Sequence, residues 1–197
     1  MTEPEFLLLK SEILQLLEDK LDPRLTYHCK GHTADVLRQS ERIAKEEGIT
    51  DERLLLLIKV AALFHDTGFL YTYKDHEQRS CKIMVERIGS AEFDGHEIEM
   101  MANMILATKV PQSPATLPEM ILCDADLDYL GRNDFDKISG ELKEEFLTFG
   151  IVKDDDAWDS LQVKFFEQHH YFTSSSVADR DPVKMKHLKN LRRKLPG

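Results

Sequence analysis

The sequence has few cysteines and no paired cysteine motif. Its three cysteines, Cys29, Cys81 and Cys123, are far apart, and none belongs to a CxxC pair. An odd number of isolated cysteines argues against a disulfide-based scaffold and favours a reducing, cytoplasmic compartment. We therefore expect free thiols with no part in the chemistry of the protein.

Positive charge and long apolar runs are also scarce. The chain carries 26 Lys and Arg against 36 Asp and Glu, a formal net charge of -10. Such a surface repels duplex nucleic acid and anionic membranes, so neither is an expected partner. The longest apolar stretch, residues 54–70, is interrupted by Lys59, His65 and Asp66 and makes a poor membrane span. The acidic first residues lack the basic segment of a signal peptide.

The apolar residues that are present recur mostly at helical spacing. Hydrophobic residues make up 42% and charged residues 31% of the chain, as in an ordinary globular protein. No alternating strand pattern, internal repeat or linker stands out, so residues 1–197 are predicted to form one all-α domain. Helices are expected at 4–21, 33–48, 52–66, 75–89, 95–108, 117–130, 133–149, 156–171 and 182–194, with Gly48 and Gly150 as stop signals and Asp51 as a cap.

The stretch LLLLIKVAALFHDTGFLY contains two adjacent residues that are costly to bury. His65 and Asp66 follow a run typical of a buried helix. A metal ion beside the helix end would compensate both residues for their lost water. Gly68 lets the chain turn away just afterwards.

Two other polar groups are further candidates for such a site. His28 and His32 are four residues apart, and Gly31 between them favours a helix start near it, which makes His32 the better ligand. Asp124, Asp126 and Asp128 follow the apolar residues MIL. Helical geometry separates Asp126 from the other two, and its apolar neighbours predict that Asp126 is the one drawn toward the core. Each group alone has an ordinary explanation as a hydrogen-bonded or capping residue.

Taken together, these segments resemble a known family. YHCKGHTADV, AALFHDTGF, DHEQRSCKI and LCDADLDYLG, within residues 27–131, are similar to motifs of the HD superfamily of metal-dependent phosphohydrolases. The resemblance implies an HD-domain-like helical bundle. It also implies His32, His65, Asp66 and Asp126 as metal ligands, with Asp124 and Asp128 as supporting or capping residues.

The resemblance also suggests a reaction. Two His and two carboxylates suit one divalent ion of Mn, Fe, Co, Ni, Zn or Mg, and such an ion would support hydrolysis of a phosphoester. The expected substrate is a nucleotide or a related small phosphorylated molecule. Besides Asp66, His76 and Glu77 are expected to take part in catalysis. The residues expected to bind substrate are Lys109, Arg132, His169, Tyr171 and Lys186.

Alternatives remain open at this point. A regulatory module of this family would bind a metal and a nucleotide without turnover. An iron-dependent oxygenase or lyase is a second alternative, although such members mostly use two metals and a later His that MILATKVPQ lacks. A helical protein without metal is the third. Self-association is left open, and the general acid or base is not assigned.

Overall fold

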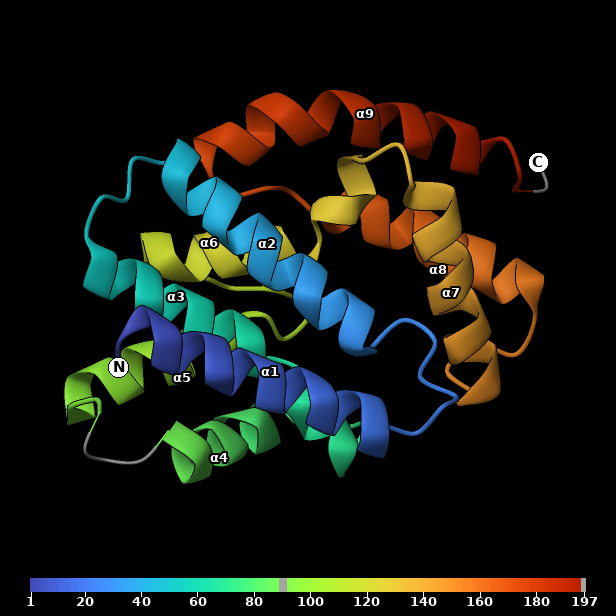
Figure 1. The fold of residues 1–197 in the computed structure, drawn as a ribbon. Coiled ribbons are helices and arrows are strands. Elements are labelled where there is room, and N and C mark those ends of the chain that lie inside the picture. The colour runs from blue at the N-terminus through green and yellow to red at the C-terminus, as the bar shows by residue number, and fades with distance from the viewer. Residues whose placement is uncertain (89–91, 196–197) are drawn as a thin grey trace.

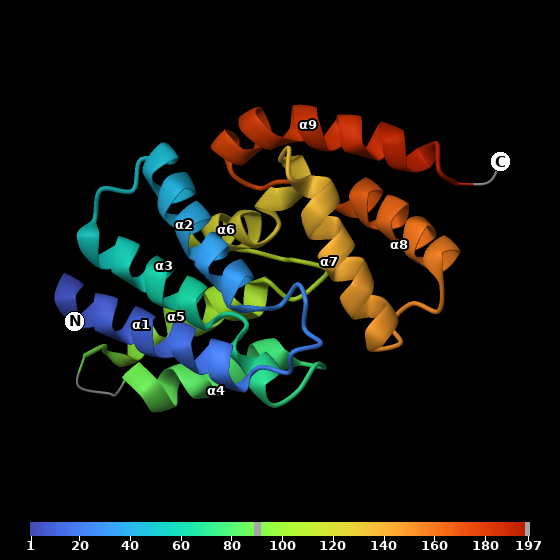
Figure 2. The same cartoon turned by 45° about the vertical axis from the view of Figure 1, so that its right-hand side comes forward.

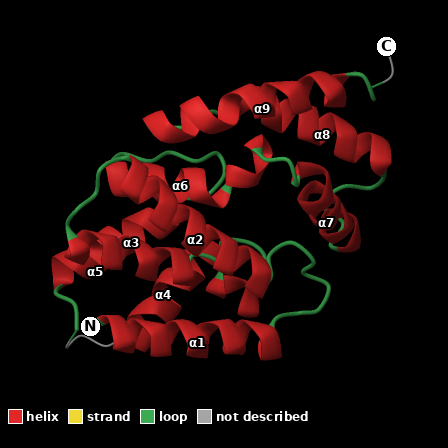
Figure 3. Ribbon diagram, turned by 45° about the horizontal axis from the view of Figure 1, so that its top comes forward, coloured by secondary structure: helices red, strands yellow, loops and turns green. Residues whose placement is uncertain are grey.

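The computed structural model describes residues 1–88 and 92–195, and this part of the chain consists of helices joined by loops (Figure 3). It contains nine α-helices, two short 3-10 helices and no strand, which confirms the predicted all-α class. The elements are α1 (Glu3–Lys20), α2 (Lys30–Glu46), α3 (Glu52–Phe64), η1 (Thr67–Leu70), α4 (His76–Ile88), α5 (Gly95–Ala107), α6 (Leu117–Asp126), η2 (Asp128–Gly131), α7 (Phe135–Thr148), α8 (Asp155–Gln168) and α9 (Ser174–Arg192).

Most predicted helix ends lie within about three residues of the observed ones, and two of the predicted helices differ by more. The helix expected at 117–130 stops at Asp126, and a separate 3-10 turn follows. The last helix begins eight residues before Pro182, because the Thr173 side chain accepts a hydrogen bond from the Ser176 backbone and caps it. The last residue predicted for the helix at 75–89 lies outside the described residues.

The helices bury two apolar clusters. The larger cluster joins α1 to α6, and the smaller one joins η2, α7, α8 and α9 (Figures 1 and 2). In both views α7 and α8 lie beside the α1–α6 bundle, and α9 runs along the top, from near α2 toward α8. The boundary between the two clusters runs past the ends of α3 and α6, where the candidate ligands lie.

Helix α3 is the central element of the larger cluster. Every residue from Leu56 to Phe64 is buried, and α3 packs against α2 and α5. Asp51 accepts hydrogen bonds from the backbone of Arg53 and Leu54, as its predicted capping role requires. Because α3 is held on all sides, the two residues that follow its last turn have fixed positions.

Lys59 interrupts the apolar run of α3, and the structure gives it a partner. Its ammonium lies 3.0 Å from a Glu3 carboxylate oxygen and over the Phe6 ring. Within the described residues, no helix is both long enough and apolar enough to cross a membrane. The three cysteines are free thiols.

Candidate metal centre

Four side chains from three segments converge where the two clusters meet. His32 comes from the first turn of α2, His65 and Asp66 from the end of α3, and Asp126 from the end of α6. His32 Nε2 lies 3.1 Å from Asp126 Oδ1, 3.3 Å from Asp66 Oδ2 and 3.4 Å from His65 Nε2. His65 Nε2 lies 3.1 Å from Asp66 Oδ2 and 3.7 Å from Asp126 Oδ1. The structure thus brings together all four residues that the resemblance implies.

Local backbone structure orients the His65-Asp66 pair. His65 Nδ1 donates to the carbonyl of Ala62 at 2.8 Å, so its Nε2 points at the other three side chains. After Asp66 the chain tightens into η1, where Gly68 packs against the start of α4. A Cβ at Gly68 would lie 2.0 Å from the carbonyl oxygen of His76, so only glycine permits this approach.

The three alternate aspartates have three different environments. Asp124 accepts hydrogen bonds from the backbone of Phe172 and Thr173 and from the Thr173 hydroxyl, and so connects α6 to the start of α9. Asp128 Oδ1 lies 2.7 Å from both Arg42 Nη2 and Arg180 Nε. Asp126 alone of the three faces the histidines.

The expectation that Asp126 is the one drawn into the core is therefore wrong. Asp124 and Asp128 are 0% and 1% exposed, whereas the Asp126 side chain is 15% exposed. The helix ends at Asp126, so the assumed helical periodicity does not reach Asp128. Backbone amides, a hydroxyl and guanidinium groups satisfy the two more buried carboxylates without any metal.

Electrostatics at the cluster favour a positive charge. Burial opposes the charged form of His32, yet its contacts with Asp126 and Asp66 raise its pKa to about 9. The pKa of His65 is also raised, because the two carboxylates outweigh its burial. Burial raises the pKa of Asp126, but the histidines overcome this and lower it to about 2. The two carboxylates therefore hold a cation here, either protons on imidazole or a metal ion.

The donor atoms fit a divalent ion. His65 donates through Nδ1, so a neutral His65 turns the lone pair of Nε2 toward the carboxylate of Asp66. Asp66 Oδ2 is buried and accepts no hydrogen bond. Bonds of about 2.0–2.2 Å to nitrogen and oxygen would place neighbouring ligands about 3.0–3.4 Å apart, close to the distances found. His32, His65 and Asp66 offer ligand atoms that all lie within 4.8 Å of one another.

His76 and Glu77 lie next to this cluster. His76 Nδ1 faces the Tyr73 carbonyl, and its Nε2 lies 3.3 Å from Asp66 Oδ1 and 3.7 Å from Glu77 Oε1. Burial opposes protonation of His76, but the contact with Asp66 raises its pKa. Glu77 Oε2 is buried without a hydrogen-bond partner. His76 and Glu77, the other two residues predicted to be catalytic, thus lie beside Asp66.

Comparison with known proteins identifies the family. The model of the HD domain family matches residues 30–128, half of the chain. This chain belongs to the HD domain family. The chain is also similar in fold to the crystal structure of a predicted HD superfamily hydrolase from an uncultured Thermotogales bacterium. The TM-score is 0.61 at 19% identity, over 93% of this chain and 89% of that one. No curated protein matches the sequence.

His32, His65, Asp66 and Asp126 are called the HD cluster below, and its two carboxylates line a cavity of about 450 Å³. Asp66, His76, Glu77 and Asp126 line one part of it, and most of the remaining wall is apolar. Much of the apolar wall comes from α7 and α8, outside the matched residues 30–128. This size is ordinary for the binding site of a small molecule.

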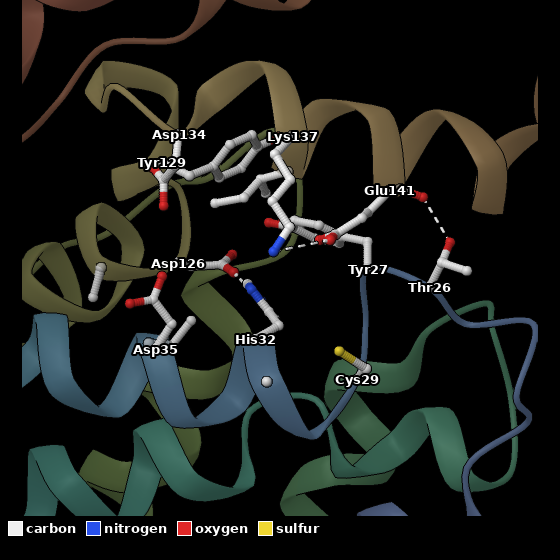
Figure 4. Close-up of a pocket in the computed structure, with 14 residues that line it drawn as sticks. Thr26, Tyr27, Cys29, His32, Asp35, Asp126, Tyr129, Asp134, Lys137 and Glu141 are labelled. Carbon is white, nitrogen blue, oxygen red and sulfur yellow. Dashed lines mark hydrogen bonds and ion pairs between the residues drawn. The ribbon is translucent and has the colours of Figure 1, made fainter.

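A second, polar cleft of about 290 Å³ lies on the other side of His32 and Asp126 (Figure 4). Carboxylates of Asp35 and Glu141 line it, and the Lys137 ammonium points into it in the close-up. Asp126, Tyr27 and Tyr129 line both the cavity and the cleft. These three residues therefore lie between an apolar space and a more polar one.

Only one of the five residues predicted to bind substrate lines the cavity. Lys109 does so, with its ammonium 2.5 Å from Asp75. Arg132 instead pairs with Asp35 and Asp134. His169, Tyr171 and Lys186 line neither the cavity nor the cleft.

Tyr171, Lys186 and His169 each lie away from the cavity and the cleft, in different surroundings. Tyr171 is 3% exposed and its hydroxyl donates to the carbonyls of Leu127 and Asp128, so it holds the segment between α8 and α9 against the start of η2. Lys186 is exposed on α9. His169 has both ring nitrogens buried without partners, and burial and Lys184 lower its pKa to about 3. None of these three residues would therefore touch a substrate bound in the cavity or in the cleft.

Sequence reasoning missed two residues that shape the site. Phe69 is stacked between the His28 and His76 rings, with centroids 4.2 and 3.9 Å away. Glu145 is fully buried and accepts hydrogen bonds from the backbone of His28, from its ring and from the Tyr73 hydroxyl. Glu145 lies 117 residues after His28 in the sequence, in a helix with many other charged residues. No local sequence pattern therefore distinguishes it as a site residue.

Proposed function

We propose that this HD domain is a metal-dependent hydrolase of phosphoesters, with one divalent ion held by His32, His65, Asp66 and Asp126. One observation carries the proposal: two histidine nitrogens and two carboxylates converge beside a cavity, and Asp66 Oδ2 is buried among them without a hydrogen bond. A mixed set of two imidazoles and two carboxylates suits Mn, Fe, Co, Ni or Zn, and Mg less well. When bound, such an ion lowers the pKa of a water ligand and offsets phosphate charge.

His76 is proposed as the residue that holds a proton for the reaction. Its Nε2 lies 3.3 Å from Asp66 Oδ1 and His76 lines the cavity, so a proton on Nε2 is within reach of a phosphate bound beside Asp66. A protonated imidazole there would bind a phosphate oxygen or protonate the departing alkoxide. The Glu77 carboxylate 3.7 Å away supports the charged form.

Two measurements test the proposal. Elemental analysis of the purified protein is expected to find one divalent ion per chain. With Mn²⁺ added, the protein is expected to release 4-nitrophenol from 4-nitrophenyl phosphate or from bis(4-nitrophenyl) phosphate. His76→Gln should keep the metal and lose about 100-fold or more in kcat, the usual scale of general acid–base catalysis. His96→Gln, at an exposed histidine of α5, is the matched control and should change neither.

Other outcomes would favour the alternatives. Two ions per chain, with an iron chromophore after aerobic purification, would favour an oxygenase or lyase. Tight nucleotide binding without phosphate release would favour a regulatory module. A folded protein that binds none of the six ions would overturn the metal centre itself.

A further inference from the structure

The wall of the 450 Å³ cavity is unusually apolar for the binding site of a nucleotide. It begins at the HD cluster and extends between α7, α8 and the segment that follows α5. The apolar residues and the Phe, Tyr and Trp residues that line it are Tyr27, Phe69, Tyr73, Val110, Leu127, Tyr129, Leu130, Leu142, Phe146, Ile151, Trp158, Leu161, Phe165 and Phe166. Aromatic rings therefore surround most of the space that a leaving group beside the cluster would enter.

Positive charge is nearly absent from this wall. Lys109 is the one Lys or Arg among the described residues that line the cavity, and Asp75 already pairs with it. Two further cations that lie within the fold face elsewhere: Arg180 binds Asp128, and Lys184 donates to the His169 carbonyl. A nucleoside di- or triphosphate would place several negative charges against this wall without a free cation to bind them.

Polar groups able to read a nucleobase are also few. Gln162 lines the cavity, but its amide nitrogen already donates to the Ser139 hydroxyl. The Tyr73 hydroxyl likewise donates to Glu145. Recognition of a base would need donors and acceptors aimed into the cavity, whereas an alkyl or aryl group needs only apolar surface.

We propose that the substrate is a phosphoester with a single phosphate and an apolar alcohol as its leaving group, an alkyl or aryl phosphate. The phosphate would lie at the HD cluster beside His76, and the apolar group would fill the cavity between α7 and α8. This assignment of the phosphate rests on the proposed function; the apolar occupant rests on the cavity alone. Hydrolysis adds water across the P–O bond, releasing inorganic phosphate and the alcohol.

A series of alkyl phosphates tests the proposal. The Mn²⁺-loaded protein is assayed with ethyl, butyl, hexyl and octyl phosphate and with nucleoside mono-, di- and triphosphates. Each added methylene that enters the cavity should raise kcat/KM by about fourfold, the effect of moving one methylene out of water. The nucleoside triphosphates should be the poorest substrates of the set.

Two leucines of equal exposure supply a variant and its control. Leu161 of α8 lines the cavity and is 37% exposed, whereas Leu147 of α7 does not line it and is 36% exposed. Leu161→Asn should lower the octyl-to-ethyl ratio of kcat/KM roughly fivefold, because part of the apolar contact is lost. Leu147→Asn should leave that ratio unchanged. Equal octyl-to-ethyl ratios in the two variants would show that the apolar group does not occupy this cavity.

Binding of an uncleavable ligand separates this inference from the proposed function. Hexyl- and octylphosphonate are titrated into the protein by calorimetry, with and without Mn²⁺. Affinity should rise with chain length, with a negative heat-capacity change of binding. If no ester is hydrolysed but this dependence appears, the proposed function fails and the apolar occupant stands. If esters are hydrolysed without regard to chain length, or if di- and triphosphates are preferred, this inference is overturned and the proposed function stands.

Discussion

Exchange of each of the three alternate aspartates for asparagine should separate stability from metal binding. The exchange keeps the volume of the side chain and removes its charge. Asp124 and Asp128 are hydrogen-bonded to other parts of the protein, whereas Asp126 faces His32 at 3.1 Å. We therefore expect the first two exchanges to lower the free energy of unfolding and the third to lower metal affinity.

The contacts of Asp128 and Asp124 indicate how much each exchange should lower the free energy of unfolding. Asp128→Asn would leave the Arg42 and Arg180 guanidiniums facing a neutral amide inside the protein, at a cost of about 3–5 kcal/mol. Asp124→Asn would weaken three hydrogen bonds at the start of α9. Burial raises the pKa of Asp124, so its charge is already disfavoured, and we expect a smaller loss of about 1.5–3 kcal/mol.

Asp126→Asn should differ from the other two exchanges in its effect on metal binding. Without metal the charge of Asp126 pairs with His32 and His65, and the lowering of its pKa to about 2 corresponds to a loss on the order of 2 kcal/mol in the free energy of unfolding at neutral pH. Loss of an outer partner of a metal ligand costs about 10–100-fold in affinity, so loss of a ligand should cost at least about 100-fold. Turnover should lose at least about 2 kcal/mol of transition-state stabilisation.

The assay is chemical denaturation of the wild type and the three variants, with chelator and with Mn²⁺. At a metal concentration of about 100 times Kd, metal adds about 2.7 kcal/mol to the free energy of unfolding. The wild type, Asp124→Asn and Asp128→Asn should all gain this increment, and Asp126→Asn should not. The reasoning fails if Asp126→Asn keeps the increment, or if either of the other variants loses it while still folded.

Three further predictions concern the surroundings of the site. In metal-free protein His32 has a folded pKa of about 9, above its unfolded value of 6.5, so its stabilisation is complete below pH 6.5. It is lost as pH rises through 9, a fall on the order of 3 kcal/mol in denaturation measurements. Metal affinity should rise over the same range, and a flat profile for both quantities would contradict the pairing. Gly68→Ala should cost more than about 2 kcal/mol and reduce turnover, because its Cβ meets the His76 carbonyl. Gly95→Ala, which meets nothing within 4 Å, should stay within about 0.5 kcal/mol by thermal melts. Glu145→Gln should cost about 3 kcal/mol with metal content unchanged, as denaturation and elemental analysis would show; loss of metal from the folded variant would refute this.

Local patterns were enough to predict the helical fold, and the resemblance to the HD superfamily then singled out the four candidate ligands. Period-3.6 spacing, the Asp51 cap and the Gly48 stop depend on neighbours within a few residues, and Gly48 indeed takes a positive φ of 79° after α2. The His65-Asp66 pair stood out because an ionisable pair at the end of a buried helix needs a partner. The assignment of Asp126 over its two neighbours came from resemblance, and the burial argument offered for it was wrong.

Sequence alone therefore determined the helices and the residue types that can hold a metal. Only the tertiary structure decided which charges are already paired. Arg132, Lys186 and Lys109 look alike as phosphate binders in a sequence, but only folding sets Arg132 against Asp35 and Asp134. The apolar cavity is likewise invisible in the chain, because residues of α7 and α8 far from the HD motif form its wall. Pairing and cavities depend on contacts between distant residues, and those contacts exist only after the two clusters have packed against each other.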